Sequence, residues 1–322
     1  MNRSLLALAV LPTGRKGGVE IGETDTDVPS CTTTITTTLP ADSSNDAYYR
    51  GAIEFHLTAP DMTAQVITDI PGTQSFRQDG AIVVWSPSSP LEPEANYSAT
   101  LEYCGGSPEI HFRTSELGTE LIPENADFQD RTYSIDMNSG RFVEGEGIAE
   151  VAATLFTQPL LLGVAAIDPD FVTMRMALSD GKTPAGQDYC ARTKNLPPAT
   201  LEDSPFIVIG GQDIELDYKD QGSFTLKDLS FEGTLAPDGT YVGGAAFSVT
   251  IDATQVTDAF DFADVAALCD FAATLGTACE TCPDSSSETC ITIAADHINS
   301  GLVDGLVIDE ITEADTDSRC AL

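Results

Sequence analysis

The feature that most constrains the fold is a stretch of regular alternation within residues 85–115. From Tyr97 to Tyr103 every second side chain is apolar or aromatic, and Ile110 and Phe112 resume the pattern after a Cys-Gly-Gly-Ser-Pro turn. Alternation with a period of two, bounded by Gly and Pro, is typical of antiparallel strands that bury one face. The stretch therefore predicts half-buried strands joined by a tight turn.

Shorter segments upstream carry the same signal. Residues 49–58 alternate apolar and polar side chains, and residues 65–68 and 80–85 are short apolar segments that follow turn residues. A Thr-rich segment at 31–38 has the composition of an edge strand. About seven short strands spaced by turn signals predict an all-β sandwich over residues 30–116.

Three motifs give this region a resemblance to a known family. Trp85-Ser-Pro, Leu91-x-Pro93-x-x-x-Tyr97 and Phe112-Arg113-Thr114 resemble the bacterial Ig-like domains of S-layer and other surface proteins. The resemblance covers little more than a quarter of the chain. It implies that Tyr97 is a corner tyrosine, that Trp85 belongs to the core, and that the domain is a spacer or presentation module without catalytic residues.

The charge balance narrows the classes of partner. The chain carries 15 Lys and Arg against 51 Asp and Glu, a net charge of −36, and its hydrophobic fraction of 42% supports a folded chain. Nucleic acids and anionic membrane surfaces attract clustered basic residues, so neither is an expected partner.

No tightly bound cofactor is expected, although calcium could bind weakly. Three Asp-x-Asp pairs could hold it weakly, although none has the ordered ligand pattern of an EF-hand loop. The pairs are Asp25 with Asp27, Asp168 with Asp170, and Asp315 with Asp317.

The N-terminus resembles an export signal. Residues 1–15 combine a basic start with an apolar run, as in a bacterial lipoprotein signal, but Arg15 stands where the lipidated cysteine would be. Residues 16–29 are acidic and rich in Gly and Thr, which predicts a flexible tether. No apolar run reaches the roughly 18 residues that a membrane span needs. We therefore expect no transmembrane segment and an extracytoplasmic location, in the periplasm, on the outer surface or secreted.

The eight cysteines fit an exported protein, in which such residues pair. In the sandwich topology that the resemblance implies, Cys31 opens the first strand at the pole where Cys104 opens the last loop, so we predict a Cys31–Cys104 disulfide. The other six are expected to form disulfides whose pairing stays open: Cys190, Cys269, Cys279, Cys282, Cys290 and Cys320. A zinc site of Cys279, Cys282, Cys290 and His297 is the alternative for part of this set.

The rest of the chain predicts a second domain. Residues 117–130 are polar and acidic and predict a linker, and residues 131–322 predict an α+β domain with a bent antiparallel sheet and about three helices. Expected strands cover 132–137, 160–167, 171–178, 206–209, 214–218, 224–235, 241–251 and 303–311, and expected helices cover 146–156, 262–275 and 288–299. Segments 206–209 and 214–218 are expected to form one hairpin and 224–235 and 241–251 another, which turns at Pro237-Asp238-Gly239. The continuous apolar run 160–167 predicts a strand buried on both faces. A shift in apolar parity predicts a β-bulge near Lys227-Asp228.

The motifs of common catalytic sites are missing from the sequence. It has no G-x-S-x-G, H-E-x-x-H, P-loop or G-x-G-x-x-G pattern, so we do not expect an enzyme. The first hypothesis is a non-enzymatic, exported bacterial surface or periplasmic protein. Its Ig-like module would present a C-terminal recognition domain to an unknown protein, glycan or lipid at the cell envelope.

The alternative is a carrier of lipid or another hydrophobic ligand. The second domain is rich in apolar residues, and a sheet that curls into an incomplete tube would leave a groove between them. The residues that would line this groove are Leu160, Leu162, Met174, Met176, Phe224 and Phe247.

Overall fold

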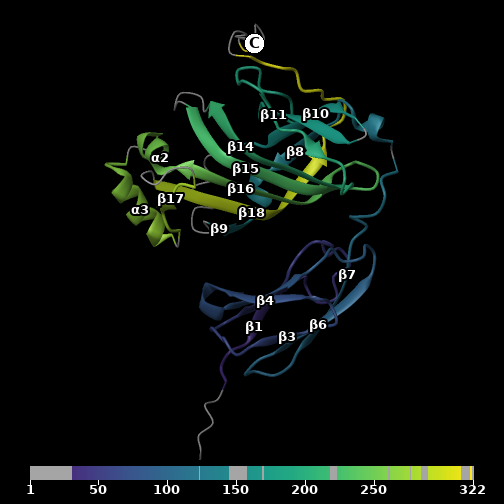
Figure 1. Cartoon of the computed structure of the whole chain (residues 1–322), viewed down its shortest axis with the longest axis vertical. Helices are drawn as coiled ribbons and strands as arrows, with labels where there is room; N and C mark the ends of the chain where they lie inside the picture. Colours follow the sequence, from purple (N-terminus) through teal and green to yellow (C-terminus); the bar gives the residue numbers. More distant parts are fainter. Residues whose placement is uncertain are drawn as a thin grey trace, which may run out of the picture. The chain divides into compact units, whose positions relative to one another are not determined.

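The computed structural model describes residues 31–122, 124–144, 158–168, 170–217, 223–259, 262–275, 277–283, 289–312 and 320. The predicted signal, tether and first helix (residues 1–15, 16–29 and 146–156) lie outside these ranges. Residues 33–322 form one compact unit with two large hydrophobic cores (Figure 1). One core belongs to a two-sheet body, residues 33–117, which we call the sandwich; Ala236, from the rest of the chain, packs into it as well. The other belongs to residues 124–320, which we call the second domain.

Two facing sheets build the sandwich. One has four strands in the order β1-β2-β5-β4, and the other has three in the order β3-β6-β7. Their bounds are β1 (Ile35–Leu39), β2 (Ile53–Leu57), β3 (Gln65–Ile67), β4 (Gly72–Arg77), β5 (Ile82–Pro87), β6 (Asn96–Glu102) and β7 (Glu109–Arg113). This is the strand order of a seven-stranded immunoglobulin sandwich of constant type.

The sandwich core follows from the alternation in its strands. Phe55 of β2 and Val83 of β5, both 0% exposed, belong to one hydrophobic cluster with Leu101 of β6 and Phe112 of β7. Trp85 is partly buried against the same cluster. Because each strand turns its other face outward, polar residues on β6 and β7 are left on the surface of the three-stranded sheet.

Tyr97 makes the contact that a corner tyrosine would make. Its hydroxyl oxygen accepts a hydrogen bond of 2.9 Å from the backbone N–H of Glu92, five residues upstream. In immunoglobulin sandwiches the corner tyrosine likewise bonds to the backbone a few residues before it. The bond fastens the loop that precedes β6 to the strand.

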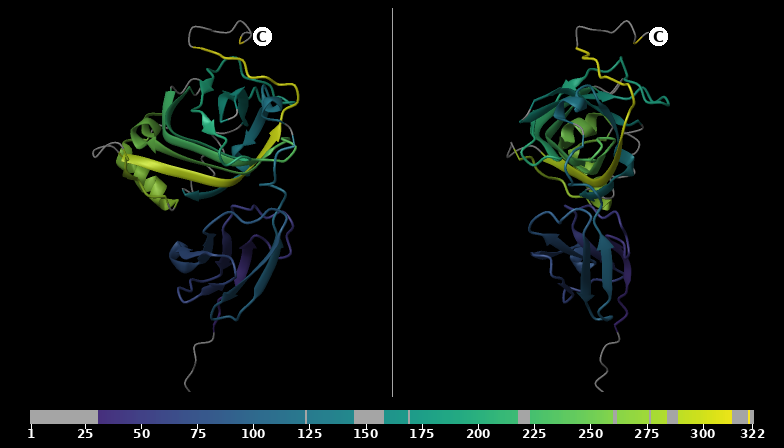
Figure 2. Two further views of the ribbon diagram at one scale, coloured as in Figure 1. Left: turned by 45° about the vertical axis from the view of Figure 1, so that its right-hand side comes forward. Right: turned by 90° about the vertical axis from the view of Figure 1, so that its right-hand side faces the viewer.

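The second domain is built on one curved antiparallel sheet of eleven strands (Figure 2). Eight strands run in the order β12-β11-β10-β8-β18-β16-β15-β14, and β13, β17 and β9 pair with β11 or β18 beside this path. Their bounds are β8 (Thr132–Asp136), β9 (Arg141–Glu144), β10 (Leu160–Ile167), β11 (Phe171–Leu178), β12 (Lys194–Asn195), β13 (Ala199–Thr200), β14 (Phe206–Asp217), β15 (Ser223–Leu235), β16 (Val242–Asp252), β17 (Glu280–Thr281) and β18 (Thr289–Leu302).

Helices are few in the described ranges. The α-helices are α2 (Ala253–Ala259) and α3 (Val265–Thr274), so the expectation of about three helices was too high for this part of the chain. Three short 3-10 turns add η1 (Gln78–Gly80), η2 (Asn125–Phe128) and η3 (Met137–Ser139). Asp264 caps α3 by accepting a 2.8 Å hydrogen bond from the Ala267 N–H. Within the described ranges, no helix is long and apolar enough to cross a membrane.

Several strand predictions are confirmed. β10 and β11 have the predicted bounds, and β15 and β16 form the predicted hairpin. The register of β15 against β16 shifts between Lys227 and Ser230, and Asp228 has a φ of +49°. The predicted bulge therefore lies where the apolar parity changes.

The predicted helix at 288–299 is wrong, because this segment lies in β18. Ala295 pairs with Phe247 and Ile298 pairs with Ala245, so between these pairs two residues of β18, Asp296 and His297, lie opposite one residue of β16. A bulge at His297, whose φ is +54°, provides the extra residue. The bulge lengthens the spacing between buried residues from two to three, which imitates a helical period.

The predicted hairpin at 206–218 is also wrong. Gly210 and Gly211 lie inside β14, which continues to Asp217 with register shifts between Ile209 and Ile214. Gly211 has a φ of +73°, so the two glycines make an irregularity within a long strand instead of a turn.

The predicted last strand at 303–311 is wrong, because the chain turns at Asp304-Gly305 after β18 and residues 306–312 pair in no strand. We call residues 303–312 the strap. Ile308 of the strap is 6% exposed and packs with Leu161 of β10 and Ala177 of β11, while Leu162 of β10 lies in the main core. Residues 161–164 of the apolar run are thus buried, as its continuity predicts, whereas Ala166 near the end of β10 is exposed. Backbone groups of Asp309 and Ile311 in the strap exchange hydrogen bonds of 2.9–3.1 Å with Gln187 and Thr193.

Candidate functional site

The predicted hydrophobic groove is filled core in this structure. Leu162, Met174, Met176 and Phe247 are 4, 1, 7 and 6% exposed and belong to one cluster, and Leu160 is partly buried against it. The side chain of Phe224 lies outside the described residues. The described groove residues therefore touch one another and leave no opening lined by their side chains.

The disulfides use the cysteines of the alternative zinc site. Cys269 pairs with Cys279, Cys282 with Cys290, and Cys190 with Cys320. Zinc needs deprotonated thiolates, so Cys279, Cys282 and Cys290 cannot act as its ligands in this state. Cys31 and Cys104 are disulfide-bonded as well, so none of the eight cysteines is free.

The calcium candidates gain no support in the described ranges. Asp168 Oδ1 accepts hydrogen bonds of 2.9 and 2.8 Å from the backbone N–H groups of Asp170 and Phe171, so it caps a turn. The other two pairs lie outside the described residues. Within the described ranges, no group of three or more His, Cys, Asp or Glu residues is arranged to hold a metal ion.

An ion network around one buried carboxylate joins the sandwich to the second domain. Glu54 of β2, whose side chain is 3% exposed, accepts hydrogen bonds of 2.5 and 3.1 Å from the guanidinium of Arg141 on β9. Arg141 also donates to Asp296 of β18 at 2.9 and 2.6 Å. Arg77, at 2.5 Å, and His56, at 3.1 Å, contact Glu54 from the sandwich side. We call these five residues the junction network.

Charge balance sets the ionisation of the junction network. Burial alone would raise the pKa of Glu54, but the hydrogen bonds and charge of Arg141, with Arg77 and His56, outweigh it and hold this pKa below its usual value. The pKa of Arg141 is raised, because its two carboxylate partners outweigh its own burial. Both groups therefore stay charged at neutral pH, and the sandwich and second domain share them.

Aromatic residues make a second contact at the same junction. The hydroxyl of Tyr48 lies 2.8 Å from Oγ1 of Thr234 on β15, and Thr234 is 0% exposed. The guanidinium of Arg50 lies 3.8 Å from the ring centroid of Phe206 on β14, a cation–π geometry. At Gly244 of β16, whose φ is +59°, an added Cβ would collide with the Tyr48 ring. The second domain thus carries a glycine where the sandwich approaches its backbone.

The predicted linker is anchored at both ends. Leu117 lies in the sandwich core and Phe128 in the core of the second domain, at 6 and 1% exposure. Ile122 N–H donates to the carbonyl of Pro237 at 2.8 Å. These contacts, with the junction network, hold the two bodies together.

A cavity of about 510 Å³ lies at this junction. Asp46, Tyr48 and Leu117 line it from the sandwich, and His297 and Asn299 line it from β18. His297 has the positive φ of the bulge, so the irregularity in β18 turns this histidine toward the cavity wall.

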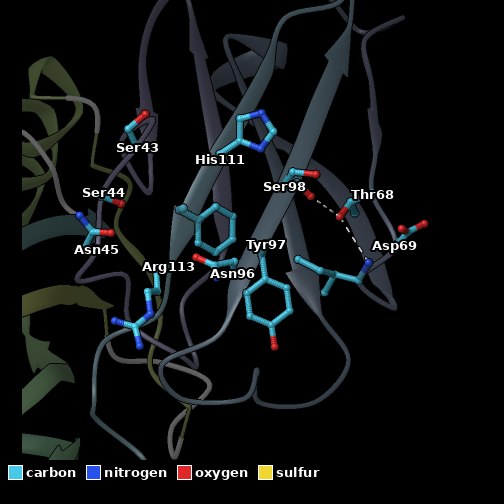
Figure 3. A pocket seen from close by; sticks show the side chains of 12 residues that line it. Ser43, Ser44, Asn45, Thr68, Asp69, Asn96, Tyr97, Ser98, His111 and Arg113 are labelled. Carbon is cyan, nitrogen blue, oxygen red and sulfur yellow. Dashed lines mark hydrogen bonds between the residues drawn. The ribbon is translucent and has the colours of Figure 1, made fainter.

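A second cavity, of about 640 Å³, lies on the sandwich (Figure 3). Its floor crosses β6 and β7, from Asn96–Ser98 to His111–Arg113. Residues 43–45 border it on the β7 side, and residues 68–70, which follow β3, border it on the other. The wall is fixed locally, because Thr68 Oγ1 donates to the Ser98 carbonyl at 2.8 Å. We call this the sandwich cavity.

These observations define a class: a disulfide-bonded, mostly β protein in which a two-sheet sandwich is joined to a domain built on one long antiparallel sheet. No protein-family model and no curated protein matches the chain. Among solved structures, an L,D-transpeptidase from Mycobacterium smegmatis is similar over 47% of this chain and 78% of its own, at 9% identity and a TM-score of 0.22. A likeness at that score carries no argument about fold or activity.

The sequence alone pointed to neither the junction network nor the sandwich cavity. Glu54 and Arg141 are 87 positions apart, and no spacing rule links them. No local signal marked Glu54 either, because the alternation of residues 49–58 places it on the face of its strand opposite Phe55, where a charged side chain is expected to be solvated.

Proposed function

We propose that this chain is a non-enzymatic binding protein of the bacterial cell envelope or exterior. In this proposal the Ig-like sandwich is a rigid support, and the second domain contacts the partner. The observation that carries the proposal is the junction network, in which Arg141 of the second domain neutralises the buried Glu54 of the sandwich. Because Glu54 is buried and Arg141 is its partner in the second domain, separating the two bodies would leave a buried charge uncompensated, which favours the single relative position that a support module requires.

The disulfides support the extracytoplasmic part of the proposal. All eight cysteines are disulfide-bonded, which is typical of proteins that fold in an oxidising compartment. The strand order of the sandwich and the hydroxyl contact of Tyr97 support its assignment as Ig-like.

Fractionation of the encoding bacterium tests the compartment. We expect the chain in the periplasmic, surface or secreted fraction, with no thiol labelled by a maleimide in denaturant until a reductant is added. A cytoplasmic chain with reactive thiols would overturn the proposal.

Co-sedimentation of the purified full chain with isolated envelopes tests binding. We expect saturable binding and, by mass spectrometry, envelope fragments that stay chemically unchanged after incubation. Failure to bind would contradict the proposed binding role. Cleaved or newly linked fragments would show an enzyme instead.

The carrier of a hydrophobic ligand is the alternative, and native mass spectrometry separates the two. A protein that holds lipid should retain it after gentle purification and add a discrete mass. We expect the bare mass of the oxidised chain, because the described groove residues are packed against one another.

A further inference from the structure

We propose that the sandwich cavity binds a neutral carbohydrate chain, so that the sandwich is a recognition module as well as a support. This inference goes beyond the proposed function, which assigns recognition to the second domain. It rests on the residues around the cavity, all of which belong to the sandwich.

Several polar side chains of the cavity have no partner among the described hydrogen bonds. Asp69, Asn45 and Asn96 are exposed, and among the described hydrogen bonds none uses their side chains. The hydroxyl of Ser98 is likewise uncommitted in the described contacts, and the Oγ of Ser44 is buried with no partner there. Carboxylate, amide and hydroxyl groups together offer both donors and acceptors, which is the mixture that sugar hydroxyls require.

The charges of the cavity exclude other ligand classes. Arg113 is the only Lys or Arg of its lining, and its guanidinium already donates to the carbonyl and carboxylate of Glu94, at 2.9 and 3.3 Å. A phosphate or other polyanion would therefore meet no free cation and a strongly acidic protein. Asp69 is the only carboxylate of the lining, too few for a metal site. A neutral ligand rich in hydroxyl groups remains, and it could pair with the amide, carboxylate and hydroxyl groups of the lining.

Size and position fit a chain of sugars. The volume of about 640 Å³ lies within the range of ligand sites, roughly 300–1,000 Å³. Tyr97, which is partly exposed, adds apolar surface between the polar groups, whereas Phe112, stacked on it at 5.8 Å, is 3% exposed and belongs to the sandwich core. Figure 3 shows polar side chains on both sides of the Tyr97 ring, with Asn45 on one side and Asp69 on the other. A ligand lying across β6 and β7 would reach both sides.

Affinity electrophoresis of the full chain tests this proposal. Native gels would contain dextran, mannan or galactan as neutral probes, and hyaluronan as the anionic probe. We expect retardation in at least one neutral gel and none with hyaluronan. The double variant Asp69→Asn with Asn96→Ala should bind at least about tenfold more weakly, as expected for the loss of two polar contacts.

Glu102→Ala is the matched control. Glu102 is an exposed residue of β6 outside the cavity, and its substitution alters the net charge by the same amount. It should leave retardation unchanged, and the variants should unfold at the same temperature as the parent chain. The proposal is overturned by no retardation in any neutral gel, by equal retardation of parent and double variant, or by stronger retardation in hyaluronan. Because binding to envelopes is measured separately, a negative result here leaves the proposed function standing.

Discussion

The sandwich buries its apolar side chains between two short-stranded sheets, whereas the second domain relies on one long sheet that needs further cover. The sandwich strands have 3–7 residues and face one another across a shared core. In the second domain, β14, β15, β16 and β18 have 11–14 residues, and the strap covers the outer face of β10. Three disulfides brace the second domain. The difference suggests that a closed sandwich tolerates the loss of one contact better than a sheet that depends on a distant segment.

The largest loss of stability is expected when the Cys190–Cys320 disulfide, whose Cys320 follows the strap in the chain, is removed. Cys190→Ser with Cys320→Ser opens a loop of 130 residues, which should cost about 5 kcal/mol in the chain-entropy model. Cys269→Ser with Cys279→Ser opens a loop of 10 residues and should cost about 3 kcal/mol. Urea unfolding of both variants measures the difference. Equal losses would show that loop length does not explain what the strap disulfide contributes.

The next test concerns the sandwich. The predicted Cys31–Cys104 disulfide should stabilise it by roughly 4 kcal/mol, because it ties down the edge strand β1. Non-reducing peptide mapping should recover one peptide that contains both cysteines, and Cys31→Ser with Cys104→Ser should lower the urea midpoint. Recovery of either cysteine with another partner would refute the pairing.

A smaller effect is expected at the junction. Arg141→Ala leaves the buried Glu54 with only Arg77 and His56 as partners. The loss of stability should be about 3 kcal/mol, the lower end for a broken buried pair, because Arg141 is itself partly exposed. In calorimetry we expect the single transition of the parent chain to separate into two. Lys182→Ala is the control, because Lys182 pairs with Asp180 at the surface with its side chain 80% exposed, and should cost at most about 0.5 kcal/mol. A single, unshifted transition for Arg141→Ala would show that the network does not join the two bodies.

Acid should weaken the same junction. The pKa of Glu54 is lowered in the folded chain, so its contribution is complete above the unfolded carboxyl pKa, about 4.3, and is lost as pH falls through the lower folded value. Urea midpoints measured downward from about pH 6 should therefore fall most steeply below about pH 4. In Arg141→Ala the fall should begin at higher pH, because the carboxylate has lost its main partner. Superimposable pH profiles would contradict this role of Glu54.

The smallest expected effect lies within the sandwich. Tyr97→Phe removes the hydroxyl that accepts from Glu92 N–H and should cost about 1 kcal/mol. Fluorescence of the single tryptophan, Trp85, in a urea titration reports unfolding of the sandwich directly. Tyr241→Phe is a comparison at another partly buried tyrosine, whose hydroxyl has no described hydrogen bond. Equal effects would show that the corner contact is not special.

Local sequence patterns predicted the strands well where no bulge interrupts the alternation of apolar and polar residues. β10 and β11 could be bounded because an apolar run and an alternating run are separated by the turn residues Asp168-Pro169-Asp170. The β15–β16 hairpin followed from the turn Pro237-Asp238-Gly239, and its bulge from a change of parity. The predictions for β14 and β18 were wrong because bulges produce patterns typical of other structures. The two glycines inside β14 resemble a turn, and the spacing of three between buried residues in β18 resembles a helix.

The candidate sites could not be predicted from local patterns. The sandwich cavity combines residues from β6, β7 and two loops, and each of them is an ordinary polar residue in its own segment. The groove was expected from apolar excess alone, and the same excess is satisfied when Met174 and Met176 pack into a closed core. Composition indicates how much apolar surface must be covered, but not what covers it.

The strap has a consequence for the order in which the protein can be completed. It follows β10 and β11 in the chain by most of the second domain, so these strands emerge from the ribosome, or from an export channel, long before Ile308 can reach them. Until then Leu161 and Ala177 face water, and the sheet presents an adhesive surface to other chains. This surface can therefore be covered only late in synthesis. A chain must extend through Cys320 before it can both cover the surface and form the Cys190–Cys320 disulfide. A shortened product would keep it open, and proteases that survey newly exported proteins could recognise it there.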